Sequence, residues 1–160
     1  MYNVGCIVAS DKGFSGERKD ACLPLMREML EPHFHITECR LCPDDRRLLS
    51  EAMRQMSGSA DLILTSGGTG FSERDVTPEA TLDVIERRAD GITQAIMYNS
   101  LSITPRAMFS RAVAGIYHKT LIINRPGSPK AVRENLTYLI PVLDHGLEVI
   151  AGKAYECGRK

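Results

Sequence analysis

The residues of this sequence whose types and spacing could do chemistry are glycines and aspartates that follow short apolar runs. The stretch TSGGTGFSERDVTPEAT (65–81) places Gly67, Gly68 and Gly70 ahead of an isolated carboxylate, Asp75. Glycines let successive backbone N–H groups face a ligand without a Cβ in the way, which favours anions such as phosphates. The spacing matches no standard nucleotide-binding motif, so the glycines alone fit a tight turn as well as a phosphate-binding loop.

A second acidic pair, Asp44 and Asp45, follows Cys42-Pro43 after another apolar stretch. Acidic residues at a helix start interact favourably with the helix dipole, so one of the two is expected to cap the next helix. Asp44 could also meet Asp75 across a pocket. Such a pair suits Mg²⁺, which prefers carboxylate oxygens together with substrate phosphates. From spacing alone, both roles of Asp44 stay open, and Asp75 could equally be a solvated loop residue.

A third stretch with ligand-binding character is RPGSPKAVRE, which begins at Arg125. Ser128 can cap a helix, Pro129 suits the first helical position, and Gly127 allows the close approach of a ligand. Arg125 and Lys130 add positive charge nearby. An anion here would meet free N–H groups and a favourable helix dipole, although the same residues would also make an ordinary corner.

The elements that must position these loops alternate between strand and helix. Apolar, β-branched runs predict strands at 2–10, 34–41, 61–66 and 121–124. Apolar residues at helical spacing predict helices at 19–31, at 44–56 and at 128–152, the last of them kinked or broken near Pro141. A further helix is predicted to begin at Pro78 in TPEATLDVIERR, with Thr77 as its cap. Residues 91–117 are predicted to form one or two helices split at Thr104-Pro105.

This alternation predicts a fold of the α/β class: a single domain over residues 1–160, doubly wound, whose mostly parallel sheet carries helices on both faces. In such sheets, ligands bind at the carboxyl ends of the strands. The loops described above would therefore meet at one rim of the sheet.

Composition narrows the classes of partner. Twenty basic residues balance twenty acidic ones, which gives no electrostatic reason to expect nucleic acid or an anionic membrane as partner. No apolar run approaches the roughly 20 residues that cross a bilayer. The N-terminus lacks the basic region of a signal peptide, so we expect a cytoplasmic protein. The five cysteines are expected to be reduced thiols.

One cluster superficially resembles a zinc site. His33, His35, Cys39 and Cys42 form H-x-H-x3-C-x2-C. However, the surrounding FHITECRL is predicted to be a strand, in which Cys39 and Cys42 would point to opposite faces. We therefore favour ordinary strand and surface residues over a metal site at this position.

Together, these motifs resemble the MogA/MoaB family of molybdenum cofactor biosynthesis proteins, which is related to the amino-terminal domain of gephyrin. The resemblance runs along nearly the whole chain and rests on SDKGFSGERKD, LCPDD, GGTGFSERDVTPEAT, SRAVAG and NRPGSPKAVRE. It implies a doubly wound α/β fold that usually forms a homotrimer. It also implies molybdopterin adenylyltransferase activity, in which ATP and molybdopterin give adenylyl-molybdopterin and pyrophosphate with Mg²⁺.

The resemblance further implies a set of site residues. The two functional aspartates of the family fall on Asp44 and Asp75, which we expect to be catalytic by holding Mg²⁺ on the ATP phosphates. The ligand-contacting loops of the family fall on Ser10, Asp11, Gly67, Gly68, Thr69, Gly70, Pro126, Gly127 and Ser128. Because both reactants are anionic, catalysis would consist chiefly of positioning and charge neutralisation, with no protein nucleophile.

The sequence departs from the family in DGITQAIMYN. There, Gln94 and Met97 stand in the places where many members carry a glutamate and an arginine. Losing an arginine near an anionic substrate would weaken binding. Two alternatives follow: a molybdopterin-binding carrier or scaffold of the same fold with little catalysis, and a nucleotide pyrophosphatase of related fold that needs no pterin.

Overall fold

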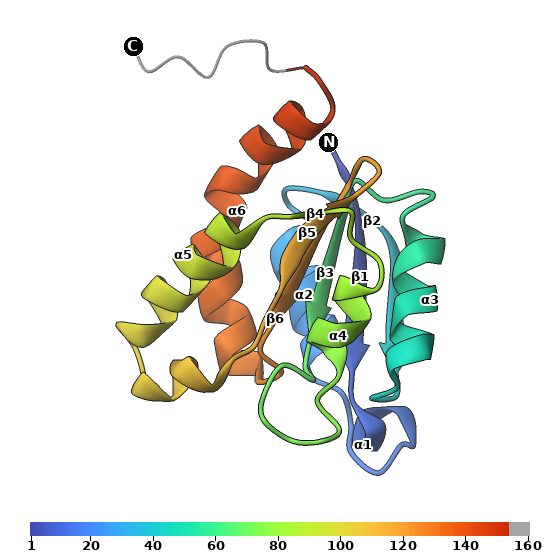
Figure 1. Cartoon of the computed structure of the whole chain (residues 1–160), viewed down its shortest axis with the longest axis vertical. Helices are drawn as coiled ribbons and strands as arrows, with labels where there is room; N and C mark the ends of the chain where they lie inside the picture. Colours follow the sequence, from blue (N-terminus) through green and yellow to red (C-terminus); the bar gives the residue numbers. More distant parts are fainter. Residues whose placement is uncertain (154–160) are drawn as a thin grey trace.

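The computed structural model describes residues 1–153, so the last part of the expected 1–160 domain lies outside the described residues. Its described strands form one six-stranded sheet in the order β2-β1-β3-β6-β5-β4 (Figure 1). The strands are β1 (Asn3–Ala9), β2 (His35–Cys42), β3 (Leu62–Ser66), β4 (Arg87–Arg88), β5 (Ala114–Tyr117) and β6 (Thr120–Arg125).

Helices cover both faces of this sheet. They are α1 (Asp11–Phe14), α2 (Cys22–Leu30), α3 (Arg46–Met56), α4 (Thr77–Leu82), α5 (Asp90–Leu101), the 3₁₀ helix η1 (Pro105–Phe109) and α6 (Pro129–Ile150). One apolar cluster joins the sheet to α2, α5 and α6, and a second joins its other face to α3 and α4 (Figure 1). The prediction of a doubly wound α/β fold is therefore confirmed.

The parallel part of the sheet places the strand ends together. β1 pairs in parallel with β2 and with β3, and β3 pairs in parallel with β6. All residues of β3 and of β6 are buried, which explains their near-continuous apolar runs. As a result, the loops that follow β1, β2, β3 and β6 all leave the sheet at one edge.

The segment 91–117 differs in part from its prediction. The split near Thr104-Pro105 is confirmed, since α5 ends at Leu101 and η1 begins at Pro105. However, 114–117 form strand β5, which pairs antiparallel with β6. A two-residue hairpin joins the two strands, and His118 adopts the positive φ of 53° that such turns favour.

Two helix predictions differ in detail from the structure. Val76, not Thr77, is the cap of α4, which therefore begins one residue early, and the helix ends at Leu82 because the chain turns there toward β4. α6 is not broken at Pro141. The proline ring lies on the exposed side, while the buried side chains of Leu139 and Leu143 hold the helix against the core.

The cysteines lie as the strand prediction requires. Cys39 packs against the cluster under α2, and Cys42 belongs to the cluster on the other face, so the two point in opposite directions. Cys6, Cys22, Cys39 and Cys42 are free thiols. Within residues 1–153, no helix is both long and apolar enough to span a bilayer.

Candidate functional site

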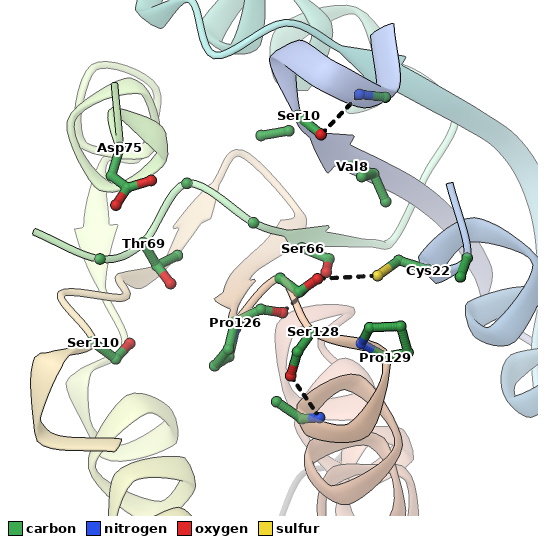
Figure 2. A pocket seen from close by; sticks show the side chains of 18 of the residues that line it. Val8, Ser10, Cys22, Ser66, Thr69, Asp75, Ser110, Pro126, Ser128 and Pro129 are labelled. Atoms are coloured by element: carbon green, nitrogen blue, oxygen red, sulfur yellow. Dashed lines mark hydrogen bonds between the residues drawn. The ribbon is translucent and has the colours of Figure 1, made fainter. Parts of the chain in front are cut away.

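The loops at the carboxyl edge of the sheet enclose a cavity of about 780 Å³ (Figure 2). This volume lies within the range of about 300–1,000 Å³ that is typical of small-molecule sites. Every predicted site residue except Asp11 lines the cavity: Ser10, Asp44, Gly67, Gly68, Thr69, Gly70, Asp75, Pro126, Gly127 and Ser128. The structure thus brings together loops that follow four different strands.

The glycine loop after β3 needs its glycines. Gly67 and Gly68 have φ values of 95° and 65°, a region that side chains with a Cβ rarely adopt. A Cβ on Gly67 would lie 2.3 Å from the carbonyl oxygen of Ala9, and one on Gly68 would lie 2.4 Å from Thr77 Oγ1. A Cβ on Gly127 would lie 2.9 Å from the Cα of Gly67, so the loops after β3 and β6 touch through backbone atoms.

Asp44 is held by Asp11 in a reciprocal arrangement. The Asp44 N–H donates to Asp11 Oδ1 at 2.9 Å, and the Asp11 N–H donates to Asp44 Oδ2 at 3.0 Å. Asp11 also accepts two hydrogen bonds from the Arg74 guanidinium, which lower the pKa of its carboxyl. Asp11 therefore lies behind Asp44 and positions it, instead of lining the cavity.

The other oxygen of Asp44 is available to a ligand. Asp44 Oδ1 is buried and has no hydrogen-bond partner among residues 1–153. Burial raises the pKa of Asp44, and the nearby charges of Asp11 and Asp75 raise it further, against the lowering effect of the Asp11 N–H. A carboxylate in this environment gains from a cation, because a cation supplies both a partner and a compensating charge.

Asp75 lines the same cavity from the loop that follows β3 (Figure 2). Its Oδ2 accepts a hydrogen bond from the Ser72 N–H at 3.0 Å, and its own N–H donates to the Ser72 carbonyl at 2.9 Å. The same Oδ2 would lie 2.8 Å from a Cβ on Gly70, so the missing side chain makes room for the carboxylate. Asp44 and Asp75 therefore line one cavity, as predicted.

The loop after β6 is held by neutral donors from its neighbours. Ser66 Oγ donates to the Pro126 carbonyl at 3.0 Å, and Cys22 Sγ donates to the Gly127 carbonyl at 3.2 Å (Figure 2). Ser128 Oγ accepts from the Ala131 N–H at 3.2 Å and so caps α6. The predicted cap at Ser128 is confirmed. The prediction that Asp44 or Asp45 caps a helix is also confirmed, since the Asp45 side chain accepts a hydrogen bond from an N–H in the first turn of α3.

A buried cation lies under the loop after β6. Arg125 is fully buried, and its guanidinium nitrogens have no hydrogen-bond partner in the described part of the chain. Burial lowers the pKa of Arg125 to about 10, so the group still carries its charge at neutral pH. The nearby thiols of Cys6 and Cys22 are neutral at that pH. A hydrogen bond with Cys39, together with burial, raises the pKa of Cys6. Burial raises the pKa of Cys22.

Sequence reasoning missed other cationic residues of the site. Arg18, Lys19 and Arg106 line the cavity, together with the acidic Asp20 and Glu134. The Arg18-Lys19 pair lies in the connection from β1 to α2, after the short helix α1 that Ser10 caps, so local charge was the available signal. Arg106 carried no such signal, because the helical pattern of residues 91–117 does not indicate which of its side chains face the site.

The departures at Gln94 and Met97 lie elsewhere. Both belong to α5, and neither lines the cavity. Within this single chain, the family differences at these positions therefore leave the cavity itself unchanged.

Arg111 was also missed as a site residue. Its backbone N–H donates to the Thr69 carbonyl at 2.8 Å, and its guanidinium donates to the carbonyls of Gly70 at 2.7 Å and Asp75 at 2.6 Å. A further hydrogen bond pairs it with Glu79 and lowers the pKa of that carboxyl. Arg111 stands in SRAVAG, and nothing in that motif indicates main-chain carbonyls as its partners.

The cavity combines a glycine loop, a capped helix start, two carboxylates and several cations, which suits a ligand that carries phosphates and a divalent cation. Comparison with known proteins agrees with this chemistry. Residues 5–145 match a family model described as "Probable molybdopterin binding domain". A solved structure described as the molybdopterin biosynthesis enzyme MoaB of Thermus thermophilus superposes with a TM-score of 0.90 and 42% identity, covering 98% of this chain and all of that one.

Two curated relatives differ in length. Molybdopterin adenylyltransferase of Helicobacter pylori strain J99 is 33% identical over 166 aligned residues, which cover 99% of this chain and 93% of the relative. Gephyrin of Dictyostelium discoideum is 46% identical over 119 residues, which cover 74% of this chain but only 17% of that much longer protein. With matches along most of its length, this chain belongs to the molybdopterin-binding domain family of molybdenum cofactor biosynthesis proteins.

Proposed function

We propose that this protein is a molybdopterin adenylyltransferase, a single domain over residues 1–160 that adenylylates molybdopterin with ATP and releases pyrophosphate. The observation that carries the proposal is the meeting of Asp44 and Asp75 in one cavity with the glycine loop. The relative of the same name from Helicobacter pylori supports it, because the alignment covers nearly all of both chains.

The donor set fits Mg²⁺. Asp44 offers a buried oxygen without a partner among the described residues, and Asp75 offers a second carboxylate to the same cavity from the loop after β3. Mg²⁺ takes one or two protein carboxylates and completes its coordination with water and substrate phosphates. When bound, it would supply charge neutralisation at the phosphates.

The residues of the chain would bind and orient the two anionic reactants. The glycine loop and the start of α6 at Ser128 present backbone N–H groups, and Arg18, Lys19 and Arg106 present positive charge to the same cavity. Holding the molybdopterin phosphate in line with the α-phosphorus of ATP turns a bimolecular step into an intramolecular one. This mechanism requires no covalent intermediate on the protein.

We also propose that the protein is a cytoplasmic homotrimer whose contacts include the segment around η1. Exposed apolar side chains gather there: Phe71 packs edge-on against Phe109 with ring centroids 5.3 Å apart, and Ile103 and Met108 are about half exposed. Apolar groups in one exposed segment are typical of association surfaces. Light scattering of the purified protein should give the mass of three chains, and the mass of one chain would contradict this part of the proposal.

The decisive experiment measures pyrophosphate release from ATP, Mg²⁺ and molybdopterin by the wild type, Asp44→Ala and Asp75→Ala. Each variant should lose roughly 100-fold or more in rate, because an electrostatic group of the site is removed. Asp83→Ala is the matched control, since that carboxylate pairs with Arg46 on an exposed surface and does not line the cavity. Equal rates for wild type and both site variants would contradict the proposal.

The same assay separates the two alternatives. Tight molybdopterin binding without turnover by the wild type would favour the carrier or scaffold. Pyrophosphate release from ATP in the absence of molybdopterin would favour the nucleotide pyrophosphatase.

A further inference from the structure

We propose that Arg111 is a positioning residue of this site, which holds the loop that carries Asp75 in its working geometry. The inference deepens the proposed function and relies on it for the kinetic part of its test. Its structural part, the order of the loop, is independent of which reaction the site catalyses.

Arg111 closes the loop at both of its ends. Nε donates to the carbonyl of Gly70, where the loop begins, and Nη2 donates to the carbonyl of Asp75, at its other end. The backbone N–H of Arg111 adds a third bond, to Thr69. Arg111 comes from the connection between η1 and β5, so a segment distant in sequence fixes the width of the loop.

All three nitrogens of the Arg111 guanidinium donate hydrogen bonds to the loop or to α4. Each of its nitrogens serves a different acceptor, since Nη1 pairs with Glu79 on α4 while Nε and Nη2 serve the two loop carbonyls. The side chain is 35% exposed, and Arg111 does not line the cavity. Arg111 therefore acts through the loop and not by touching a ligand.

The loop has little else to hold it. Residues 71–74 are exposed and belong to no helix or strand. Besides Arg111, the side chains that bond the loop are Ser72 and Asp75, which act within it, and Asp11, which forms an exposed ion pair with Arg74. The ring of Phe71 also lies edge-on against Phe109, but both rings are more than half exposed. An exposed ion pair contributes little to rigidity, because water and salt compete for both charges. Among hydrogen bonds from outside the loop, the position of the Asp75 main chain thus depends chiefly on Arg111.

The test compares Arg111→Lys and Arg111→Ala with the wild type and with Arg46→Ala. Arg46 is the matched control, because it makes a two-point ion pair with Asp83 near the other end of α4, away from the cavity. Lysine retains the charge of Arg111 but cannot bridge two carbonyls and Glu79 at once. The readouts are the thermal midpoint, kcat and KM for ATP, and hydrogen exchange of the amides in 70–76.

Both Arg111 variants should lose about 10- to 100-fold in kcat, the range seen when a supporting partner of a ligating group is removed, with a much smaller change in KM. Amide exchange in 70–76 should accelerate in both variants and stay unchanged in Arg46→Ala. Free guanidinium ion at millimolar concentration should restore part of the activity of Arg111→Ala, but should not affect Arg46→Ala.

Two outcomes would overturn the inference. A lowered thermal midpoint with unchanged kcat and unchanged exchange in 70–76 would reduce Arg111 to an ordinary structural residue. Full activity of Arg111→Lys would show that charge alone suffices. If the wild type releases no pyrophosphate, the proposed function fails, while the exchange measurement still decides whether Arg111 orders the loop.

Discussion

The loops after β3 and β6 lie side by side and touch, yet they are held in opposite ways. The loop after β3 is held by arginines, with Arg111 on its carbonyls and Arg74 paired to Asp11. The loop after β6 is held by the neutral side chains of Ser66 and Cys22. Beneath it lies Arg125, a buried cation with no hydrogen-bond partner among residues 1–153.

The difference shows two uses of positive charge in one site. In the loop after β3, the arginines are paired, so they fix geometry and leave little net attraction for a ligand. Under the loop after β6, the charge is unpaired, which costs folding free energy and favours an anion nearby. We therefore expect substitutions in the loop after β3 to act by altering the structure of the loop. Substitutions around the loop after β6 should change the free energy of unfolding and the affinity for anions independently of each other.

The largest effect is expected at the contact between the two loops. Gly67→Ala should lower the free energy of unfolding by roughly 3 kcal/mol or more, because it combines a positive φ with a clash against a backbone carbonyl. Gly146→Ala is the control, since nothing lies within 4 Å of its added Cβ in α6. Urea denaturation compares the two, and equal stability of both variants would contradict the backbone contact.

Replacing the unpaired cation should stabilise the fold. Arg125→Met should raise the free energy of unfolding by about 1–4 kcal/mol, because a buried charge without a partner is exchanged for apolar packing. The same variant should bind pyrophosphate more weakly in calorimetry. Arg125→Lys should also bind pyrophosphate more weakly, because an ammonium without a partner at a fully buried site loses its proton far more readily than a guanidinium. A less stable Arg125→Met would mean that the charge is compensated in the folded protein.

The helix start after β6 should show a smaller effect. Ser128→Ala should cost about 1 kcal/mol of stability, because the Ala131 N–H loses its cap. Ser128→Asp should retain the cap and the thermal midpoint, but bind pyrophosphate more weakly because it adds a negative charge. Unchanged binding by Ser128→Asp would indicate that anions do not approach this helix.

The smallest effect is expected for the exposed pair in the loop after β3. The Arg74 guanidinium lowers the pKa of Asp11, so the pair stabilises the fold above the ordinary value of 3.8 and is lost as the pH falls through the lower folded value. The thermal midpoints of wild type and Arg74→Gln should thus differ slightly at neutral pH and converge in acid. They should also converge in ~1 M salt, which screens exposed charges.

Local sequence was enough to predict the parallel strands and the loops that follow them. β1, β3 and β6 are apolar runs, and the glycines, prolines and aspartates after them mark the turns. β5 was missed because Ala114–Tyr117 is short and continues a run compatible with a helix, so its identity depends on pairing with β6. β4 has only two residues and likewise depends on its partner.

Motifs and the family resemblance indicated most of the loop residues that line the cavity, but not its cations Arg18, Lys19 and Arg106, and not the residues that support the loops. Arg111 donates hydrogen bonds to main-chain carbonyls, and because every residue has a carbonyl, the sequence does not indicate which ones it contacts. Arg125 was predicted only as positive charge near a helix start, because burial of a single charged residue at a strand end is decided by the elements that later cover it. The roles of Asp44 and Asp75 stay predictions until the variants are measured.

The contact between Gly67 and Gly127 also limits how this pocket could be redesigned. Because a Cβ on Gly127 would lie 2.9 Å from the Cα of Gly67, the floor of the pocket has no room for new side chains. An engineer who wishes to admit a different anion would have to work on the walls. Arg18, Arg106 and Phe109 line those walls, come from segments outside the two loops, and can change size or charge without disturbing the floor.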